Sequence, residues 1–411
     1  MDASTSRQHL LITPGAAPGT EEAEHRRSRV AEPGERLLHA DLHNHTLFSD
    51  GRGPAEQAFA SMREAGLDVA AITDHSFGEC DPANTIAGED WVELGALADA
   101  ADEPGRFVAI RGFEWSSHTI GHMNVWGGRG YVPPLPLLAD GVAADIAVAD
   151  PGPADHPVAI AAFHEWLLTH TDAGTADGED ALLGFNHPGR EPGRFGEFHH
   201  EPALTRRVVG LEMFNRGDDY LFERVDTGLS SPLVDCLEAG WRPGLTGVTD
   251  EHKPIWGTQL GLGRTGMWAR ETSRAGVREA MLRRRLFATR ERDLRADATA
   301  NGVPMGSAVP DAGTLTIAVD LGGDAVTGRR VRVQALASGR PLPRVVTDFD
   351  ATVGASPITF DVERSAVPGG WLVLRVTDPD APADLRARGH APYAGAGRTL
   401  AYLSPFFLEV T

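Results

Sequence analysis

Cysteine and lysine are nearly absent from this chain of 411 residues. The two cysteines, Cys80 and Cys236, are too few for a framework of disulfides or for a cage of thiolates around a metal ion. Any metal ion must therefore be bound through nitrogen and oxygen. Lys253 is the only lysine, so the other basic side chains are arginines and histidines.

Long apolar runs are absent as well. The first 35 residues lack the apolar core of a signal peptide, and no later run reaches the length that crosses a bilayer. These absences predict a cytoplasmic protein without a membrane anchor.

Positive charge is scarce. The 38 Lys and Arg residues against 58 Asp and Glu residues give a net charge of −20, which repels the phosphates of nucleic acids and anionic lipids. We therefore expect a small-molecule substrate rather than a nucleic acid or a membrane surface. The sequence leaves open whether the chain forms a homo-oligomer. Its length fits two or three domains.

Short apolar runs that end in polar residues alternate with helical patterns, which predicts β/α units. The expected strands are Ala40–His45, Val69–His75, Phe107–Trp115, Met123–Trp126, Leu182–His187, Val208–Asn215 and Leu245–Asp250. The expected helices are Ala55–Ala65, Asp90–Ala101, Val158–Thr169, Asp219–Ala239 and Arg274–Leu286. Seven strands of this kind are enough for a barrel.

Changes in composition and in the pattern of apolar residues divide the chain into three parts. We expect residues 1–36 to be disordered, residues 37–290 to form the barrel and residues 291–411 to form a small β-sandwich. The sandwich is predicted from short alternating strands, which are Leu315–Leu321, Arg330–Ala337, Ile358–Val362, Trp371–Thr377 and Phe406–Val410. An acidic insertion at about 130–180 has no Lys or Arg, and we expect a solvated loop with one helix rather than a substrate lid.

The first expected strand ends in His43-Asn44-His45. Residues two apart in an extended chain point the same way, so these two imidazoles could bind one metal ion. Taken alone, the motif is more often a pair of hydrogen-bonded histidines. The later strands, however, end in the same kinds of residue.

Side chains at the C-terminal ends of barrel strands converge on one mouth. Nine residues that can bind a metal would then meet there: His43, His45, Asp50, His75, Glu114, His122, His187, Asp250 and His252. Burying so many imidazoles and carboxylates without cations would be costly. This ligand chemistry suits two or three divalent ions of Zn, Mn or Fe, and Glu114 could bridge two of them.

This ordered set resembles the PHP superfamily, the polymerase and histidinol phosphatase metallohydrolases. The resemblance covers roughly Leu37 to Leu286 and implies a distorted (β/α)7 barrel. It depends on the opening His-x-His, Ser49–Gly51, Thr73–His75, Glu114, His122, His187 and the closing Asp-x-His. Gly121–Val125, Asn186–Gly189 and the trailing sandwich that ends in Ser404-Pro405 resemble the carbaryl-hydrolase-type branch.

The resemblance implies which residues hold each ion. The first ion would be bound by His43, His45, Glu114 and Asp250, the second by Glu114, His122 and His187, and the third by Asp50, His75 and His252. Asp50 stands where many relatives have a histidine, which leaves the occupancy of the third site open. Glu251 stands where relatives often have a small residue, so it either supports the ligands or faces solvent.

Amidohydrolases also open with His-x-His, but they usually close with a lone aspartate and use a carbamylated lysine. Lys253 follows the closing motif instead of lying in the middle of the expected barrel, which disfavours that family.

Further charged residues lie near the expected mouth. We expect Asp250, His252, Lys253 and Arg264 to act in catalysis, although Lys253 could equally be an exposed loop residue without a role. Any of Arg190, Arg216 and Arg264 could clamp a substrate anion, although each taken singly is more often a surface or salt-bridged arginine, and Arg264 is the preferred one. Asp74 is expected to orient its neighbour His75 rather than to bind a metal.

These features predict a metal-dependent hydrolase. Two close divalent ions lower the pKa of a bound water from 15.7 towards about 7 and polarise the group under attack. Cations near the mouth favour a small phosphoester as substrate. The alternatives are a carbamate or carboxylic ester hydrolase of the carbaryl-hydrolase type, and a non-catalytic PHP-like binding or structural module.

Overall fold

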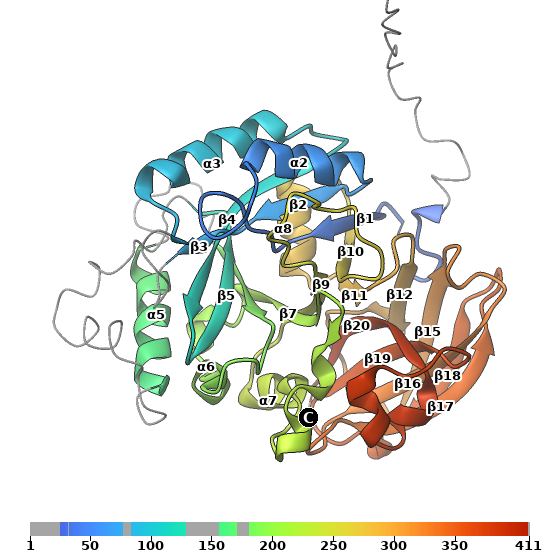
Figure 1. The fold of residues 1–411 in the computed structure, drawn as a ribbon. Coiled ribbons are helices and arrows are strands. Elements are labelled where there is room, and N and C mark those ends of the chain that lie inside the picture. Colours follow the sequence, from blue (N-terminus) through green and yellow to red (C-terminus); the bar gives the residue numbers. More distant parts are fainter. Residues whose placement is uncertain (1–24, 32, 77–83, 129–155, 171–180, 410–411) are drawn as a thin grey trace, which may run out of the picture.

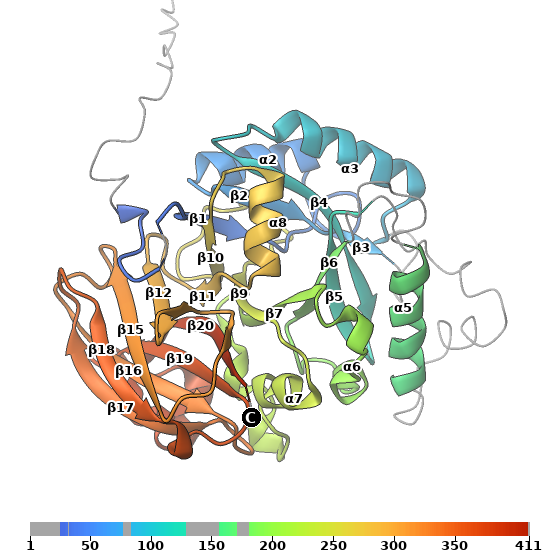
Figure 2. The same ribbon diagram turned by 180° about the vertical axis from the view of Figure 1, so that it is seen from behind.

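The computed structural model describes residues 25–31, 33–76, 84–128, 156–170 and 181–409. The chain forms a large mixed sheet, a smaller sheet and a set of helices that pack on the large one (Figure 1, Figure 2). No helix in these described ranges has both the length and the apolarity that crossing a bilayer requires.

The first eleven strands surround the candidate site. They are β1 (Arg36–Asp41), β2 (Val69–Ile72), β3 (His75–Ser76), β4 (Val108–Ser117), β5 (Gly121–Trp126), β6 (Leu182–Asn186), β7 (Val208–Asn215), β8 (Asp218–Asp219), β9 (Gly244–Val248), β10 (Arg264–Ala269) and β11 (Leu286–Thr289). Each of the seven predicted strands overlaps at least one of them, whereas β8, β10 and β11 were not predicted.

The remaining strands follow in the C-terminal part. They are β12 (Arg295–Ala300), β13 (Val303–Pro304), β14 (Ala308–Val309), β15 (Thr314–Gly322), β16 (Arg330–Ala337), β17 (Arg344–Thr352), β18 (Ile358–Glu363), β19 (Trp371–Asp378) and β20 (Arg398–Leu408). All five strands predicted in this region overlap an observed strand.

The helices are α2 (Ala55–Glu64), α3 (Gly88–Ala101), α5 (His156–His170), α6 (Arg194–Phe198), α7 (Pro232–Ala239) and α8 (Arg274–Leu282). The expectation of one helix over Asp219–Ala239 was wrong in its first half. Pro232 occupies the first turn of α7, where its missing N–H is not needed, and Gly228 adopts a left-handed φ of +93° just before it.

The strands do not close into the predicted barrel. The path of the large sheet is β17-β16-β19-β20-β11-β10-β1-β2-β4-β5-β6-β7-β8, and β9 pairs only with β7 among the described strands. The Thr265 hydroxyl on β10 donates to the Gly247 carbonyl at 2.8 Å and accepts from its N–H at 3.2 Å. The Thr265 side chain thus takes up the N–H and carbonyl of Gly247. These are backbone groups of β9 that strand pairing with β10 would use to close the barrel.

The prediction of β/α units was also wrong for β5, and the strand β10, which was not predicted, does not follow that pattern either. β5 runs antiparallel to both β4 and β6, and β10 runs antiparallel to β1. The pairs β1–β2, β2–β4, β6–β7 and β7–β9 are parallel, as β/α units require.

The C-terminal region continues the large sheet. β11 pairs with β20, so β16, β17, β19 and β20 extend the same ladder that passes through the candidate site. A separate sheet, β13-β12-β15-β18, shares one apolar core with these strands, built from residues such as Ala298, Ile317, Val333 and Leu374. The two parts are therefore joined by backbone hydrogen bonds.

Residues 25–31 and 33–36, which belong to the segment predicted to be disordered, contact the rest of the chain. Arg26 pairs with Asp68 at 2.7 Å, and Arg29 Nε donates to Asp320 at 2.7 Å. The rest of this segment, and most of the acidic insertion at about 130–180, lie outside the described residues.

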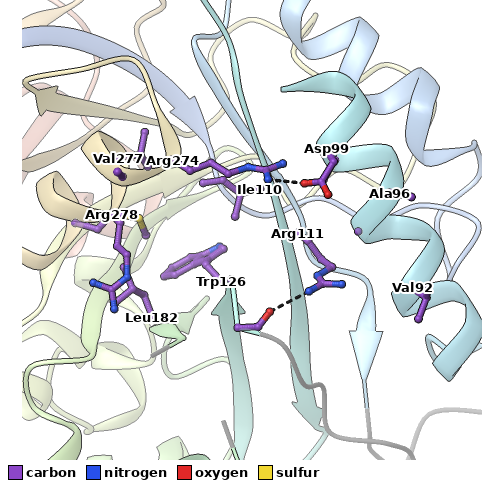
Figure 3. Close-up of a pocket in the computed structure, with 16 residues that line it drawn as sticks. Val92, Ala96, Asp99, Ile110, Arg111, Trp126, Leu182, Arg274, Val277 and Arg278 are labelled. Carbon is purple, nitrogen blue, oxygen red and sulfur yellow. Dashed lines mark hydrogen bonds and ion pairs between the residues drawn. The ribbon is translucent and has the colours of Figure 1, made fainter. Parts of the chain in front are cut away.

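The inner side of the curved sheet is filled mainly by aliphatic side chains. Alternate residues of β1, Leu38 and Ala40, pack there with Val277 and Met281 of α8. A cavity of about 520 Å³ remains between α3 and α8 (Figure 3).

Candidate metal centre

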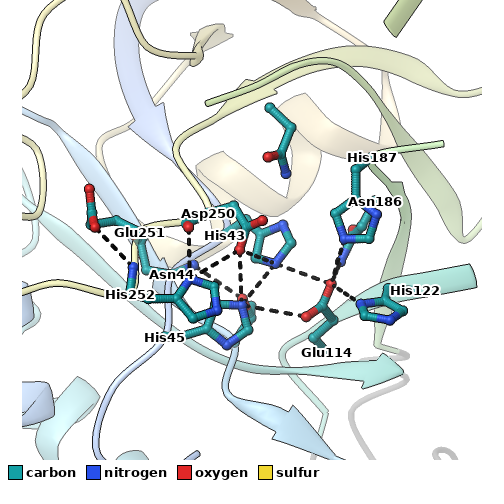
Figure 4. A network of polar contacts seen from close by, with 12 residues as sticks. His43, Asn44, His45, Glu114, His122, Asn186, His187, Asp250, Glu251 and His252 are labelled. Atoms are coloured by element: carbon teal, nitrogen blue, oxygen red, sulfur yellow. Dashed lines mark hydrogen bonds and ion pairs between the residues drawn. The ribbon is translucent and has the colours of Figure 1, made fainter. Parts of the chain in front are cut away.

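The nine predicted ligands lie together in one cluster, whose centre is shown in Figure 4. His43 and His45 follow β1, His75 lies in β3, Glu114 in β4, His122 in β5, His187 follows β6, Asp250 and His252 follow β9, and Asp50 precedes α2. His122 reaches the same edge from an antiparallel strand because it lies near the start of β5, in register with Asn186.

Glu114 is the centre of the cluster. Its Oε1 lies 3.2 Å from Nε2 of His43, 3.2 Å from Nδ1 of His122 and 3.3 Å from Nε2 of His187. Its Oε2 lies 2.9 Å from Nδ1 of His75 and 3.4 Å from Nε2 of His45. One buried carboxylate therefore contacts five imidazoles, as a residue that bridges metal ions would.

Asp250 and Asp50 contribute carboxylates on the side of the closing motif. Asp250 Oδ1 lies 3.3 Å from Nε2 of His45 and 3.5 Å from Nε2 of His43. Asp50 Oδ2 lies 3.3 Å from Nε2 of His252. Asp50 is the most exposed of these side chains, at 36%, so this end of the cluster opens to solvent.

The cluster divides into four overlapping groups that could each hold a metal ion. These are His43, His45 and Asp250; His45, Asp50, His75 and His252; His75, Glu114 and His122; and His122, His187 and Glu191. The first two resemble the predicted first and third sites, and the second of them gains His45. Glu191, which the sequence analysis missed, joins His122 and His187.

The atoms of the cluster fit cations. Nε2 of His43 and Nε2 of His45 are 3.1 Å apart. Two ligands each about 2.1 Å from one ion lie about 3.0 to 3.4 Å apart at octahedral or tetrahedral angles. In the described part of the chain, four buried atoms of the cluster make no hydrogen bond, namely His45 Nδ1, His122 Nε2, His187 Nδ1 and Glu191 Oε2, although the last two lie 3.5 Å from each other. The donor types and their spacing suit Zn, Mn or Fe.

The buried groups of the cluster differ in whether their surroundings favour the charged or the neutral form. Burial opposes ionisation, yet Glu114 and Asp250 have pKa values held well below their usual range because imidazoles surround them, His43 most closely. Burial likewise opposes a charge on His187, but Glu191 and Glu114 raise its pKa to about 9. For His45, burial and the neighbouring His75 and His252 lower the pKa to about 3.

Glu212 on β7 supports two of the predicted ligands. Its Oε1 lies 2.8 Å from Nδ1 of His43, and its Oε2 accepts the backbone N–H of His187 at 2.6 Å. Carboxylate oxygens accept, so this contact places a proton on Nδ1 of His43 and turns Nε2 towards the cluster, where a bound ion would take its lone pair. A carboxylate within the buried run Val208–Asn215 was the sequence signal for this residue.

Two predicted ligands have strained backbones. The φ angles of His187 and Asp250 are +27° and +48°, in or near the left-handed region that residues other than glycine seldom adopt. The N–H of Asp250 donates to the His43 carbonyl at 3.0 Å, which ties the closing loop to the opening motif. Such conformations persist where surrounding contacts enforce them, and they are frequent at functional sites.

Asp74 and Glu251, two charged residues near the ligands, both accept hydrogen bonds from the loops that carry these ligands. Asp74 accepts from the backbone and hydroxyl of Thr46 and from the hydroxyl of Ser49, so it fixes the loop after His45. Glu251 is buried, and its Oε1 accepts the N–H groups of His252 and Lys253 at 3.0 and 2.8 Å. It therefore supports the closing motif and does not face solvent.

Arg216, and not Arg264, lies against the cluster. Arg216 Nη2 donates to the Asp250 carbonyl at 3.2 Å and is 3.3 Å from Nδ1 of His252, while 56% of its side chain stays exposed. Arg190 lies at the same rim and donates to Glu191 at 2.6 Å. Lys253 is an exposed residue next to the ligands.

The assignment of Arg264 to a loop at the mouth was wrong. It is the first residue of β10, and its guanidinium donates to the Arg292 carbonyl at 3.0 Å. Thr265 points towards β9, and because strand residues alternate, Arg264 points to the opposite face. There it is close enough to His39 to lower the pKa of that imidazole, after the larger effect of burial.

Comparisons with known proteins give structural likenesses only. No protein-family model and no curated protein sequence matches the chain. Solved structures with some likeness include a two-domain protein from Bacteroides vulgatus that contains a predicted PHP-like metal-dependent phosphoesterase. It is 17% identical, the match covers 92% of this chain and 98% of that one, and the TM-score is 0.44.

Two further solved structures match shorter stretches. One, from Bifidobacterium adolescentis, is provisionally assigned as a metal-dependent phosphoesterase, with 18% identity, 59% of this chain and 95% of that one covered, and a TM-score of 0.30. The other is an amidohydrolase from Chromobacterium violaceum with bound sulfate and no metal, with 16% identity, 52% and 88% coverage, and a TM-score of 0.27.

Proposed function

We propose that the protein is a metal-dependent hydrolase that acts on a small phosphoester. The observation that carries this proposal is the convergence of nine nitrogen and oxygen ligands, from seven separate segments of the chain, in one cluster with the carboxylate of Glu114 at its centre. The sequence resemblance to the PHP superfamily agrees with it.

The residues that would hold the ions are those of the cluster. His43, His45 and Asp250 would bind one ion, Glu114, His122 and His187 with Glu191 a second, and Asp50, His75 and His252 a third. Divalent cations supply Lewis acidity and make water acidic enough to yield a nucleophile near neutral pH.

The chain itself positions the reactants. Glu212 keeps the proton of His43 on Nδ1, away from the cluster. Arg216 presents an exposed guanidinium beside Asp250 and His252, where it can bind an anionic oxygen of a substrate and stabilise charge that develops during the reaction. Arg190 adds a second cation at the rim, although Glu191 already occupies its Nε.

These two arginines support a phosphoester over a neutral ester or carbamate. A phosphate monoester carries negative charge that the guanidinium groups can bind, whereas a carbamate offers them little. The net charge of −20 favours a small substrate over a polyanion. We further propose that the part following residue 290 supports the site rather than taking part in the chemistry.

The test is metal analysis combined with a substrate panel. Purified protein should contain two or three equivalents of transition metal, and His43→Ala or Asp250→Ala should lose metal and activity while keeping the circular dichroism spectrum. His199→Ala, which changes an exposed histidine outside the cluster, should retain both.

The Mn-loaded and Zn-loaded proteins would be assayed on aryl phosphomonoesters, phosphodiesters, carboxylic esters and carbamates. Turnover of phosphoesters supports the proposal. Inertness towards phosphoesters beside rapid carbamate or ester turnover would assign the carbaryl-hydrolase type of activity instead. Metal binding without any turnover would favour a binding module, and metal content and activity unchanged in both variants would refute the metal centre.

A further inference from the structure

A cavity with a lining unlike that of the metal centre lies between α3 and α8, beside the first half of β4 (Figure 3). Its volume of about 520 Å³ is within the range of pockets that bind small molecules. β4 lends Ile110 and Arg111 to this cavity and, three residues further on, Glu114 to the metal centre. None of the residues that line the cavity belongs to the groups around Glu114.

One side of the cavity is apolar. Trp126, Leu182, Val277 and Met281 line it, and all four are buried. The Trp126 indole N–H donates to the Leu42 carbonyl at 2.8 Å, so the polar atom of this ring is already satisfied. The ring is held in place where a Cβ on Gly184 would lie 2.4 Å from it. This wall offers apolar contact to a ligand.

The other side is cationic. Arg111, Arg274 and Arg278 line the cavity against the single carboxylate of Asp99, so the lining carries a formal charge of three minus one, or +2. This local charge is opposite in sign to the net charge of the chain, which is −20. The carboxylate of Asp99 is bound to Arg274, at 2.5 Å.

Arg111 is a cation with neutral hydrogen-bond partners. Its guanidinium lies 4.1 Å above the Trp91 ring and donates to the carbonyls of Gly128 at 3.0 Å and Trp91 at 3.3 Å. Among the described residues it makes no ion pair. Burial lowers its pKa, and the nearby Arg274 lowers it further against the opposing effect of Asp99. An anion in the cavity would stabilise the charged form of Arg111 against both burial and the repulsion from Arg274.

We infer that this cavity binds an amphipathic organic anion, with a carboxylate next to Arg111 and Arg278 and an aromatic or alicyclic body against Trp126 and Met281. The arginines recognise a planar carboxylate through charge-assisted hydrogen bonds. The apolar wall accepts the body of the ligand, and burial of that body favours binding over inorganic anions.

The experiment is isothermal titration calorimetry of the full-length, metal-loaded protein with 1-naphthoate as the probe. We expect saturable binding of one equivalent. 1-Naphthylmethanol has the same rings without the charge, and sulfate has the charge without the rings. Both should bind at least tenfold more weakly than naphthoate.

Two variants locate the bound probe. Arg278→Met should weaken naphthoate binding about tenfold or more. Ala96→Trp adds a ring at an exposed position of α3 that lines the cavity, so it should block binding without removing a hydrogen bond. Arg329→Met, which changes an exposed arginine between β15 and β16, is the matched control and should bind as the natural protein does.

Absence of saturable binding would overturn the inference. So would affinity unchanged in both Arg278→Met and Ala96→Trp, because the probe would then lie elsewhere, for example at the metal centre. Equal affinity for naphthoate and naphthylmethanol would also overturn it, since the arginines would then contribute nothing.

Discussion

Oε1 of Glu212 lies 2.8 Å from Nδ1 of His43, on the side of the imidazole that faces away from the other ligands. The same carboxylate accepts the backbone N–H of His187 at 2.6 Å and the side-chain amide of Asn215 at 2.9 Å. One residue of β7 therefore fixes the orientation of a ligand from β1 and the backbone of a ligand from β6.

Glu212→Gln should weaken metal binding about tenfold to hundredfold, because outer partners of metal-bound histidines have effects of this size. Glutamine can accept from one partner through its oxygen, but its amide nitrogen then faces another donor. Metal affinity would be measured by competition with a chromogenic chelator. Glu197→Gln, at an exposed position, is the control, and equal affinity in the two variants would contradict the role of Glu212.

Removal of metal should lower stability as well as activity. Ions that bind only the folded chain stabilise it by RT ln(1 + [M]/Kd), so a hundredfold excess over Kd is worth about 2.7 kcal/mol. Thermal melting should therefore shift downwards after treatment with a chelator and recover when Mn or Zn is added back. The same Tm with and without metal would argue against ion binding by the folded cluster.

Arg216→Gln should reduce kcat/KM for phosphomonoesters about tenfold or more, since a hydrogen bond to a charged group is worth about 1.5 to 3 kcal/mol. Its effect on neutral aryl esters should be much smaller. Arg206→Gln, another exposed arginine, controls for the loss of one positive charge. A uniform loss on charged and neutral substrates would show that Arg216 acts on the ligands rather than on the substrate.

Arg285 is a buried structural cation. It binds Glu35 at 2.7 Å and Asp297 at 2.8 Å, and all three side chains are at most 4% exposed. Arg285→Met would leave the buried Asp297 without its cation and would remove one of the two arginines that bind Glu35, so we expect the free energy of unfolding to fall by about 3 to 5 kcal/mol in urea titrations. Arg283→Met breaks a partly exposed pair with the same Glu35 and should cost about 1 kcal/mol or less. Similar losses in the two variants would contradict this reasoning.

His164 should make the fold sensitive to acid. It is buried on α5, neither ring nitrogen has a hydrogen-bond partner in the described part of the chain, and it faces His199, His200 and Trp241. Burial, followed by the two histidines, lowers its pKa to about 3, against 6.5 in the unfolded chain. Because the unfolded chain takes up the proton first, the stabilisation is complete above pH 6.5 and is lost as the pH falls towards 3.

At pH 5 this loss amounts to about 2 kcal/mol. His164→Leu removes the titration, so its free energy of unfolding should fall less between pH 8 and pH 5 than that of the natural protein. Measurements at pH 8 give the constant effect of the substitution on packing. Parallel curves for the two proteins would show that His164 does not cause the acid sensitivity.

Much of the candidate site follows from local sequence. An apolar run that ends in His, Asp or Glu places that residue close to the end of a strand wherever the strand lies, and this was enough to find His43 and His187, which follow β1 and β6, although Glu114 lies within β4. The shape of the sheet did not follow, because whether β9 and β10 form a ladder depends on the Thr265 hydroxyl reaching Gly247.

The sequence by itself determined the chemistry available, which is nitrogen and oxygen ligands at strand ends in an acidic chain almost free of cysteine and lysine. Tertiary structure alone decided which charged residues face those ligands. Arg264 is turned away, whereas Arg216, Glu191 and Glu212 are brought to the cluster. The physical reason is that the face of a strand and the register between distant segments are set by packing across the whole sheet, and no local pattern encodes them.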